Sequence, residues 1–306
     1  MQITSPPAPL TDNLWMLGSA AYPLYLFQDG NEAAIVEGGT GAMGPLLAQQ
    51  LDDLGIAPET VNQVIVTHAH PDHVMAVPKF REMFPGVSVS ASQAAAGTLS
   101  IEKALAFFGK MDQALTGALL NAGVITEAHR PEPLAENRIA IDRTLQEGDT
   151  IRIGRVELDV LETPGHSDCS LSFRQTDAGV LVVSDATGYY LPEQNEWWPN
   201  YFTGYGVYLD SMRRLAELDA EVLCLSHNAA IQGGDAVKAY FEAAIAATEQ
   251  YHRRIIEQTR AGKPAREIAE QLGSRIYEKK PLLPLDFFQK NCALLVKISL
   301  QHEGIE

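Results

Sequence analysis

Four segments of this 306-residue chain share one arrangement, in which a short run of mostly apolar, β-forming residues leads directly to a histidine or an aspartate. The runs VIVT, LDVLETPG, VLVVS and EVLCLS lead to His68, His166, Asp185 and His227, respectively. In layered α/β proteins the strand ends at one edge of a sheet open onto a common crevice, so residues far apart in the sequence can meet there. The pattern therefore predicts an α/β layered fold with one polar site at its strand ends.

The remaining segments agree with an α/β fold. An Asp-Gly-Asn turn within residues 23–39 predicts a β-hairpin, and residues 43–55 have apolar residues at helical spacing. Strands and helices then alternate along the chain, which is the order expected of a layered α/β fold. Residues 92–128 have a mostly helical pattern and are expected to form an insertion. We therefore expect a core over residues 1–234 and a helical C-terminal extension over residues 235–306.

The charge of the chain argues against several kinds of partner. It carries 23 basic and 39 acidic residues, for a net charge of −16, and it has no run rich in lysine or arginine. Nucleic acids and anionic membrane surfaces both bind cationic protein faces, so we expect neither as a partner. No signal peptide is visible, and three widely spaced cysteines are typical of a reducing compartment, so we expect a cytoplasmic protein.

The densest of the four strand-end sites is the bend HAHPDH, which holds His68, His70, Asp72 and His73. In an irregular loop after a strand, His68 and His70 can hold one metal ion, while Asp72 and His73 face a second. A carboxylate such as Asp185 has two oxygens and can bridge two cations about 3.5–4 Å apart. The alternative is that the histidines are ordinary loop residues and that Asp185 caps a helix. The strand-end context of all four segments favours a two-metal site.

With these motifs, the chain resembles the metallo-β-lactamase superfamily. The resemblance depends on the H-x-H-x-D-H bend, the PGHS segment, the strand-end aspartate and the terminal histidine, in the same order and at similar spacing over residues 14–230. It implies an αβ/βα sandwich of two mixed sheets flanked by helices, which binds two divalent transition-metal ions. It also implies how the ligands divide: His68, His70 and His166 for the first ion, Asp72, His73 and His227 for the second, and Asp185 between them.

Three positions refine the resemblance. Ser184 precedes the strand-end aspartate, and Asn228 follows the terminal histidine, at positions where many members have glycine, although asparagine tolerates the left-handed conformation. His70 stands where the flavin-partnered di-iron branch has glutamate, which favours a hydrolase over an oxidoreductase. Imidazole and carboxylate ligands suit zinc, iron or manganese, and zinc is the ion that we expect.

The ligand set predicts hydrolysis by a metal-activated hydroxide. A water that bridges two such cations has its pKa lowered from about 15.7 toward about 7, and the resulting hydroxide can attack a thioester or ester carbonyl. Asp72 and Asp185 are the expected catalytic residues, Asp72 by orienting the water or moving its proton and Asp185 by bridging the ions.

Three alternatives stay open. Lactone hydrolysis is the nearest, because the same attack opens a ring. Hydrolysis of a glutathione thioester is less attractive, because the extension shows no basic cluster that could receive a glutathione carboxylate. A signalling effector that acts through a protein partner belongs to another class, and a sealed pocket with a large exposed apolar face would favour it.

Substrate choice must depend on residues outside the ligand set. The loop over residues 188–208 is dense in aromatic residues, and Tyr189 and Tyr190 are expected to line the substrate pocket. Phe287 and Phe288 are expected to contribute to the same pocket, in an extension that folds over the metal crevice as a lid. The alternatives are that the aromatic loop packs onto the core and that the extension forms a homodimer contact.

The whole layout is similar to one branch of the family, which includes the 2-aminobenzoylacetyl-coenzyme A thioesterase of quinolone-signal biosynthesis. The segments LTDNLWMLG, AIVEGG and VTHAHPDH carry this similarity. It implies a small-molecule thioester or ester as substrate, and it does not extend to the aminobenzoyl group.

Overall fold

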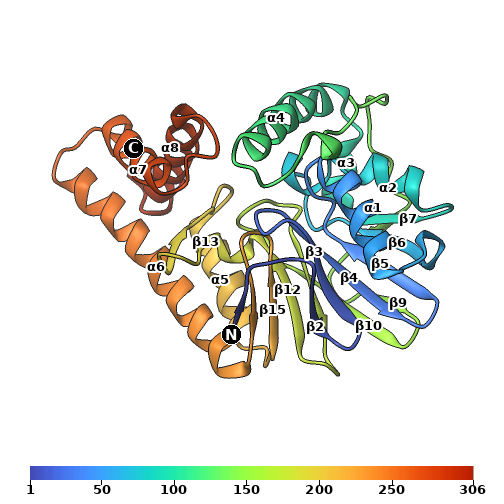
Figure 1. Ribbon diagram of the computed structural model, residues 1–306. Helices are drawn as coiled ribbons and strands as arrows, with labels where there is room; N and C mark the ends of the chain where they lie inside the picture. The colour runs from blue at the N-terminus through green and yellow to red at the C-terminus, as the bar shows by residue number, and fades with distance from the viewer. Residues whose placement is uncertain (306) are drawn as a thin grey trace.

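Two seven-stranded mixed sheets stack face to face in the computed structural model, which describes residues 1–305, and helices cover their outer faces (Figure 1). The first sheet has the strand order β2 (Ala8–Thr11), β3 (Leu14–Gly18), β4 (Pro23–Asp29), β5 (Glu32–Val36), β6 (Val61–Ile65), β7 (Ser88–Ser92) and β8 (Arg143–Leu145). The second has the order β1 (Gln2–Ile3), β16 (Ala230–Gln232), β15 (Val222–Leu225), β12 (Val180–Ser184), β11 (Leu171–Gln175), β10 (Val156–Glu162) and β9 (Thr150–Ile153). The predicted sandwich of two mixed sheets is confirmed.

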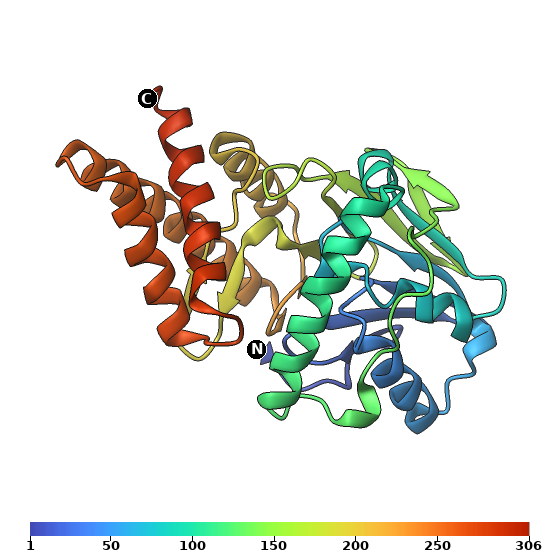
Figure 2. The ribbon, with the colours of Figure 1, turned by 90° about the horizontal axis from the view of Figure 1, so that it is seen from above.

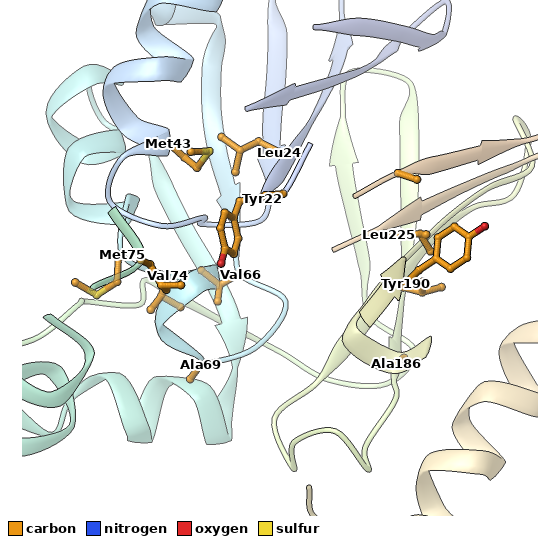
Figure 3. Packing of buried hydrophobic residues seen from close by; sticks show 14 of the residues in the cluster. Tyr22, Leu24, Met43, Val66, Ala69, Val74, Met75, Ala186, Tyr190 and Leu225 are labelled. Carbon is orange, nitrogen blue, oxygen red and sulfur yellow. The ribbon is translucent and has the colours of Figure 1, made fainter. Parts of the chain in front are cut away.

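Side-chain alternation in the central strands produces two separate apolar layers. In β4, Tyr25 and Phe27 pack between the sheets, whereas Leu24 and Leu26 face the helices, and all four are fully buried. On the helix side, Leu24 lies beside Met43 (Figure 3). A strand that is covered on both faces needs apolar residues at consecutive positions. This requirement explains why the central strands read as continuous apolar runs.

The helices divide between the two outer faces and the C-terminal extension. α1 to α4 lie outside the first sheet, and α5 and α6 lie outside the second (Figure 1). Their bounds, with those of the two extension helices that follow, are α1 (Met43–Leu54), α2 (Val77–Met83), α3 (Gln93–Leu99), α4 (Glu102–Asn121), α5 (Tyr205–Ala216), α6 (Gly234–Arg260), α7 (Ala265–Lys279) and α8 (Leu285–His302). Four 3-10 turns lie between elements, at η1 (Pro58–Thr60), η2 (Pro71–His73), η3 (Glu127–His129) and η4 (Asp185–Thr187).

The local predictions agree with these elements. β4 and β5 pair antiparallel with Asp29 opposite Glu32, so Gly30 and Asn31 form the turn of the expected hairpin. α1 ends at Gly55, whose φ of 67° is a left-handed conformation that glycine adopts without strain. α3 and α4 occupy the chain between β7 and β8, where a helical insertion is expected.

Strand direction brings the predicted ligands to one edge of the sandwich. β5, β6, β7 and β8 run parallel to one another, and β12 runs parallel to β15. β10 has the direction of β12, because both strands are antiparallel to β11. β6, β10, β12 and β15 are the strands that precede the four strand-end ligands, so within each sheet the ligands share an edge.

The C-terminal extension packs on the second sheet and on a small separate hairpin. α6 contacts α5, β15, β16 and β14 (Glu196–Trp198), which pairs with β13 (Tyr189–Leu191). α7 and α8 pack closely on each other. Figure 2, a view from above, shows α7 and α8 on one side and α4 on the other. No helix within residues 1–305 combines the length and apolar character that a membrane span requires.

Candidate metal centre

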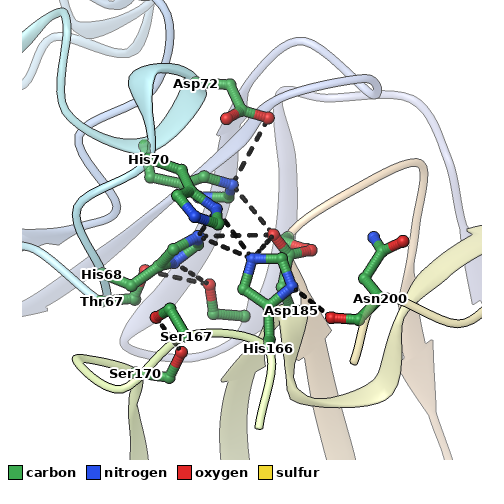
Figure 4. A network of polar contacts seen from close by, with 12 residues as sticks. Thr67, His68, His70, Asp72, His166, Ser167, Ser170, Asp185 and Asn200 are labelled. Atoms are coloured by element: carbon green, nitrogen blue, oxygen red, sulfur yellow. Dashed lines mark hydrogen bonds and ion pairs between the residues drawn. The ribbon is translucent and has the colours of Figure 1, made fainter. Parts of the chain in front are cut away.

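Seven side chains converge in two groups at the edge where β6, β10, β12 and β15 end (Figure 4). The ligand atoms of each group lie within 4.8 Å of one another. The first group is His68, His70, His166 and Asp185, and the second is Asp72, His73 and His227. The structure thus brings together all seven residues that the sequence suggests as ligands, divided as the family resemblance implies.

The spacing within the first group fits a single metal ion. His166 Nε2 lies 2.9 Å from His70 Nδ1 and 3.2 Å from His68 Nε2, and His68 Nε2 lies 3.1 Å from His70 Nδ1. Nitrogens that bind one tetrahedral zinc ion at about 2.0–2.1 Å lie about 3.3 Å apart. A cation between the three rings would therefore accept all three lone pairs at once.

Asp185 connects the two groups. Its Oδ2 lies 3.3 Å from His166 Nε2 and 3.2 Å from His73 Nε2, and its Oδ1 lies 3.4 Å from His227 Nε2. His73 Nε2 is buried and has no hydrogen-bond partner among residues 1–305. Because a buried polar atom without a partner is costly, this nitrogen fits a metal ligand beside the Asp185 carboxylate. The donor set as a whole fits two metal ions.

Of the two carboxylates in these groups, Asp72 is the one that solvent reaches more easily. Its side chain is 25% exposed, whereas that of Asp185 is 5% exposed. Asp72 Oδ2 lies 3.6 Å from His73 Nε2 and 3.8 Å from His227 Nε2. Solvent therefore reaches the centre on its Asp72 side.

Backbone carbonyl groups fix the orientation of two ligand histidines. His166 Nδ1 donates to the Asn200 carbonyl oxygen at 2.9 Å, and His227 Nδ1 donates to the Ala21 carbonyl oxygen at 2.8 Å. A proton on Nδ1 leaves the Nε2 lone pair free and directed into the site. The loops after β14 and β3 thus determine which ring nitrogen is available to a metal.

Glu37 belongs to the site although the sequence motifs do not include it. Its Oε2 accepts hydrogen bonds from His73 Nδ1 and Thr67 Oγ1, both at 2.9 Å, and the residue is 2% exposed. Its φ of 84° is unusual for a residue with a side chain, and such strain is often found at functional sites. The signal was present in the sequence, because Glu37 follows the buried strand AAIV as the other ligands follow theirs.

The two departures from the family pattern are accommodated locally. Ser184 has a φ of 47°, and its hydroxyl lies 2.9 Å from Thr67 Oγ1. Asn228 has a φ of 67°, the left-handed conformation expected for it, and its Nδ2 donates to the Tyr190 carbonyl oxygen at 2.7 Å. Both backbones adopt a conformation that glycine favours, and both side chains form a hydrogen bond.

The protonation states of the first group suit metal binding. Burial, followed by repulsion from neighbouring histidines, holds the pKa of His68 well below its usual range and lowers the pKa of His70 to about 3. Burial alone would raise the pKa of the Asp185 carboxyl, but His166 and His227 hold it well below its usual range. Neutral imidazole and ionised carboxylate are the forms that bind metal.

The hairpin formed by β13 and β14 places Tyr189 and Tyr190 on opposite faces, as consecutive strand residues must be. The Tyr189 ring lies 4.7 Å from the His227 ring. The Tyr190 ring lies 4.7 Å from the Trp197 ring and 5.3 Å from that of Tyr240 on α6. The structure therefore brings Tyr189 to the metal centre and directs Tyr190 away from it, which corrects the expectation that both line the pocket.

The aromatic residues of α8 support the hairpin from behind. The Phe288 ring lies 5.5 Å from the Trp198 ring, which in turn lies 6.4 Å from the Tyr189 ring. Phe287 packs on Phe288 at 5.5 Å, and within residues 1–305 no ring contact joins either phenylalanine to a ligand histidine. Their expected contribution to the pocket is thus indirect, through the wall that holds Tyr189.

Comparisons with solved structures show the same fold. Residues 23–227 match the family described as the Metallo-beta-lactamase superfamily. A metallo-beta-lactamase family protein from Thermus thermophilus superposes with a TM-score of 0.64 at 23% identity, over 97% of this chain and 95% of that chain. BJP-1, a subclass B3 metallo-beta-lactamase of Bradyrhizobium japonicum, superposes with a TM-score of 0.58 at 18% identity, over 85% of this chain and 98% of that chain. At these identities the likeness shows the fold alone.

Relatives by sequence cover only part of the chain. A hydroxyacylglutathione hydrolase of Cereibacter sphaeroides (strain ATCC 17025 / ATH 2.4.3) is 30% identical over 126 residues, which are 41% of this chain and 34% of that protein. An uncharacterized protein of Mycobacterium leprae (strain TN) is 28% identical over 200 residues, which are 64% of this chain and 80% of that protein. The match with the hydrolase thus spans about a third of its length.

Proposed function

Because this chain belongs to the metallo-beta-lactamase superfamily, we propose that it is a hydrolase that uses two divalent transition-metal ions to cleave a thioester or an ester. The proposal depends chiefly on the two groups of ligand atoms, in which three imidazole nitrogens lie 2.9–3.2 Å apart. A set rich in imidazole suits zinc, with iron and manganese as alternatives. The relatives named hydroxyacylglutathione hydrolase support a thioester as the bond that is cleaved.

Each group of the site has a separate task in this proposal. When bound, the ions would polarise the substrate carbonyl and lower the pKa of a water molecule. Asp185 holds the two groups of ligands at a fixed separation, because its two oxygens contact histidines of both. Asp72, which is accessible to solvent, orients the attacking water and takes its proton on a carboxylate oxygen. Burial raises the pKa of Tyr189 to about 12, so its hydroxyl stays protonated and can donate to the substrate carbonyl.

The C-terminal extension would act on substrate choice. In this proposal, residues 1–234 form the catalytic core and residues 235–306 the extension. Phe288 of α8 supports the Tyr189 wall, because it packs on Trp198, which in turn lies beside Tyr189. A bulky acyl group would then compete for space with this wall. The three cysteines are free, which supports a reducing, cytoplasmic location.

The test combines metal analysis with a substrate panel. Protein expressed with zinc should contain two ions per chain and should hydrolyse thioesters or esters. His166→Ala should lose metal and activity, whereas His129→Ala, a surface histidine outside the site, should keep both. Hydrolysis of lactones alone would support the lactonase alternative. If protein expressed with zinc contains no metal and hydrolyses none of these substrates, the enzyme is rejected and the signalling effector is favoured. The exposure of Asp72 argues against the sealed pocket that such an effector would have.

A further inference from the structure

A second concave site lies behind the β13–β14 hairpin. A cavity of about 650 Å³ opens between α6, α7 and β14, and its walls include Trp197, Arg253, Arg254 and Arg275. A neighbouring cavity of about 420 Å³ shares Arg254, Leu272 and Arg275 with the first. The two cavities therefore form one groove around Arg254 and Arg275, which we call the arginine groove.

Two guanidinium groups of this groove, those of Arg254 and Arg275, are not paired with an acidic neighbour among residues 1–305. Other arginines of the same helices do form such ion pairs, for example Arg260 with Glu303 and Arg266 with Glu270. Uncompensated arginines that line a cavity stand out in a chain with a net charge of −16. Such a site attracts an anion.

The acidic side chains at the groove do not cancel the positive charge of its arginines. Arg253 lies 3.7 Å from Glu249, but Glu249 also accepts a hydrogen bond from Arg213 at 2.8 Å. Glu196 lines the groove and is paired with Lys279. Glu278 lines the smaller cavity. The groove therefore carries a net positive charge.

The remaining walls suit a planar ring. One face of Trp197 is covered by Tyr190, and Trp197 also lines the cavity. Ala243, Ala246 and Ala247 lie on one side of α6 and give the groove an open apolar floor, while the amide side chains of Asn195 and Gln250 stand at its walls. Aromatic stacking and amide groups can bind a heterocyclic base, and arginines bind phosphate.

We propose that the arginine groove binds a phosphorylated nucleotide, with its phosphates at Arg254 and Arg275 and its base against Trp197. The expectation from the sequence that the extension lacks a basic cluster is therefore wrong, because α6 and α7 bring together arginines that are separated along the chain. This assignment does not depend on the proposed hydrolase activity.

The hairpin is the common wall of the groove and the metal centre. Tyr190 pairs with Trp197 and packs on this ring, which lines the groove, whereas Tyr189 pairs with Trp198 and packs on His227. The nucleotide could come from two sources. It could be a free effector that moves this wall, or it could be the nucleotide part of the thiol that a thioester substrate releases.

Equilibrium titration of the full chain with ADP, pyrophosphate and inorganic phosphate at low salt tests the assignment. We expect saturable binding of ADP, weakened at least roughly tenfold in Arg254→Ala/Arg275→Ala. Arg260→Ala/Arg266→Ala removes the same charge from the same helices outside the groove and should change the affinity less than about twofold. Trp197→Leu should weaken ADP binding and leave pyrophosphate binding unchanged.

Three results would overturn the assignment: no saturable binding of ADP, equal weakening in both double variants, or saturable binding of glutathione in place of ADP.

A second experiment decides whether the nucleotide is a free effector or part of the substrate. It compares acetyl-coenzyme A with an acetyl thioester of N-acetylcysteamine, which carries no nucleotide. A substrate role predicts that Arg254→Ala/Arg275→Ala raises KM for acetyl-coenzyme A alone. An effector role predicts that ADP changes turnover of the nucleotide-free thioester. Failure to hydrolyse either would count against an acetyl thioester as substrate and leave the ADP titration, which tests the assignment itself, valid.

Discussion

Replacing Glu37 with glutamine tests whether a buried carboxylate prepares His73 to bind metal. Glu37 Oε2 accepts two hydrogen bonds, from His73 Nδ1 and Thr67 Oγ1, both at 2.9 Å. Glutamine can keep its one oxygen at the position of Oε2, while its NH₂ group takes the place of Oε1, which has no hydrogen-bond partner among residues 1–305. The substitution therefore removes the negative charge behind His73 but keeps an acceptor there, and Nε2 of the imidazole becomes a weaker metal ligand.

The size of the effect follows from these contacts. A hydrogen bond to a charged group contributes about 1.5–3 kcal/mol and a neutral one about 0.5–1.5 kcal/mol, so loss of the charge costs roughly 1–1.5 kcal/mol. This cost corresponds to about a tenfold change in affinity, the lower end of the about 10–100-fold range for changes behind a metal ligand. We therefore expect Glu37→Gln to weaken binding of the ion at Asp72, His73 and His227 by about tenfold. The ion held by the first group should be affected much less.

Competition with a zinc chelator, followed to two stoichiometric steps, measures both affinities. Glu32→Gln is the matched control, because it makes the same chemical change at the exposed first residue of β5, the strand that Glu37 follows. Denaturant unfolding of the metal-free proteins separates a binding effect from a folding effect. If Glu37→Gln binds both ions with the affinities of the unmodified protein, the charge of Glu37 does not prepare His73 for a metal and the reasoning is wrong.

Three further predictions concern the bridge, the hairpin wall and a surface ion pair. Asp185→Asn should lower turnover at least about tenfold while the metal-free fold, followed by circular dichroism, survives; unchanged turnover with both ions retained would refute a bridging role. Phe288→Ala should alter KM for long relative to short acyl groups and leave the metal content unchanged; identical kinetics on both would show that α8 does not shape the pocket. Asp29→Asn should destabilise the protein at neutral pH, because hydrogen bonds from Arg155 lower the pKa of Asp29 from 3.8 to about 2. Stability from a lowered carboxyl pKa is present above the unfolded-state pKa and is lost as the pH falls through the folded-state pKa. In denaturant titrations, the difference in unfolding free energy between the unmodified protein and Asp29→Asn should therefore shrink between pH 3.8 and about 2.

The sequence alone determined the layered fold and the set of candidate ligands, because both depend on local patterns. A buried strand must be apolar at consecutive positions, and the residue that follows it lies at a sheet edge. His68, His166, Asp185 and His227 could therefore be assigned to one edge before any distance was known. Glu37 obeys the same rule after β5, so it was predictable in principle, but only its contact with His73 shows its task.

Tertiary structure decided the features that depend on which faces meet. Strand alternation requires Tyr189 and Tyr190 to point in opposite directions, but only the packing of α6 against the hairpin determines which of them faces His227. The arginine groove likewise forms only when α7 folds back onto α6 and brings Arg275 near Arg254. Local periodicity predicts the apolar side of each helix, whereas the partner of that side is chosen by the packing of the whole chain.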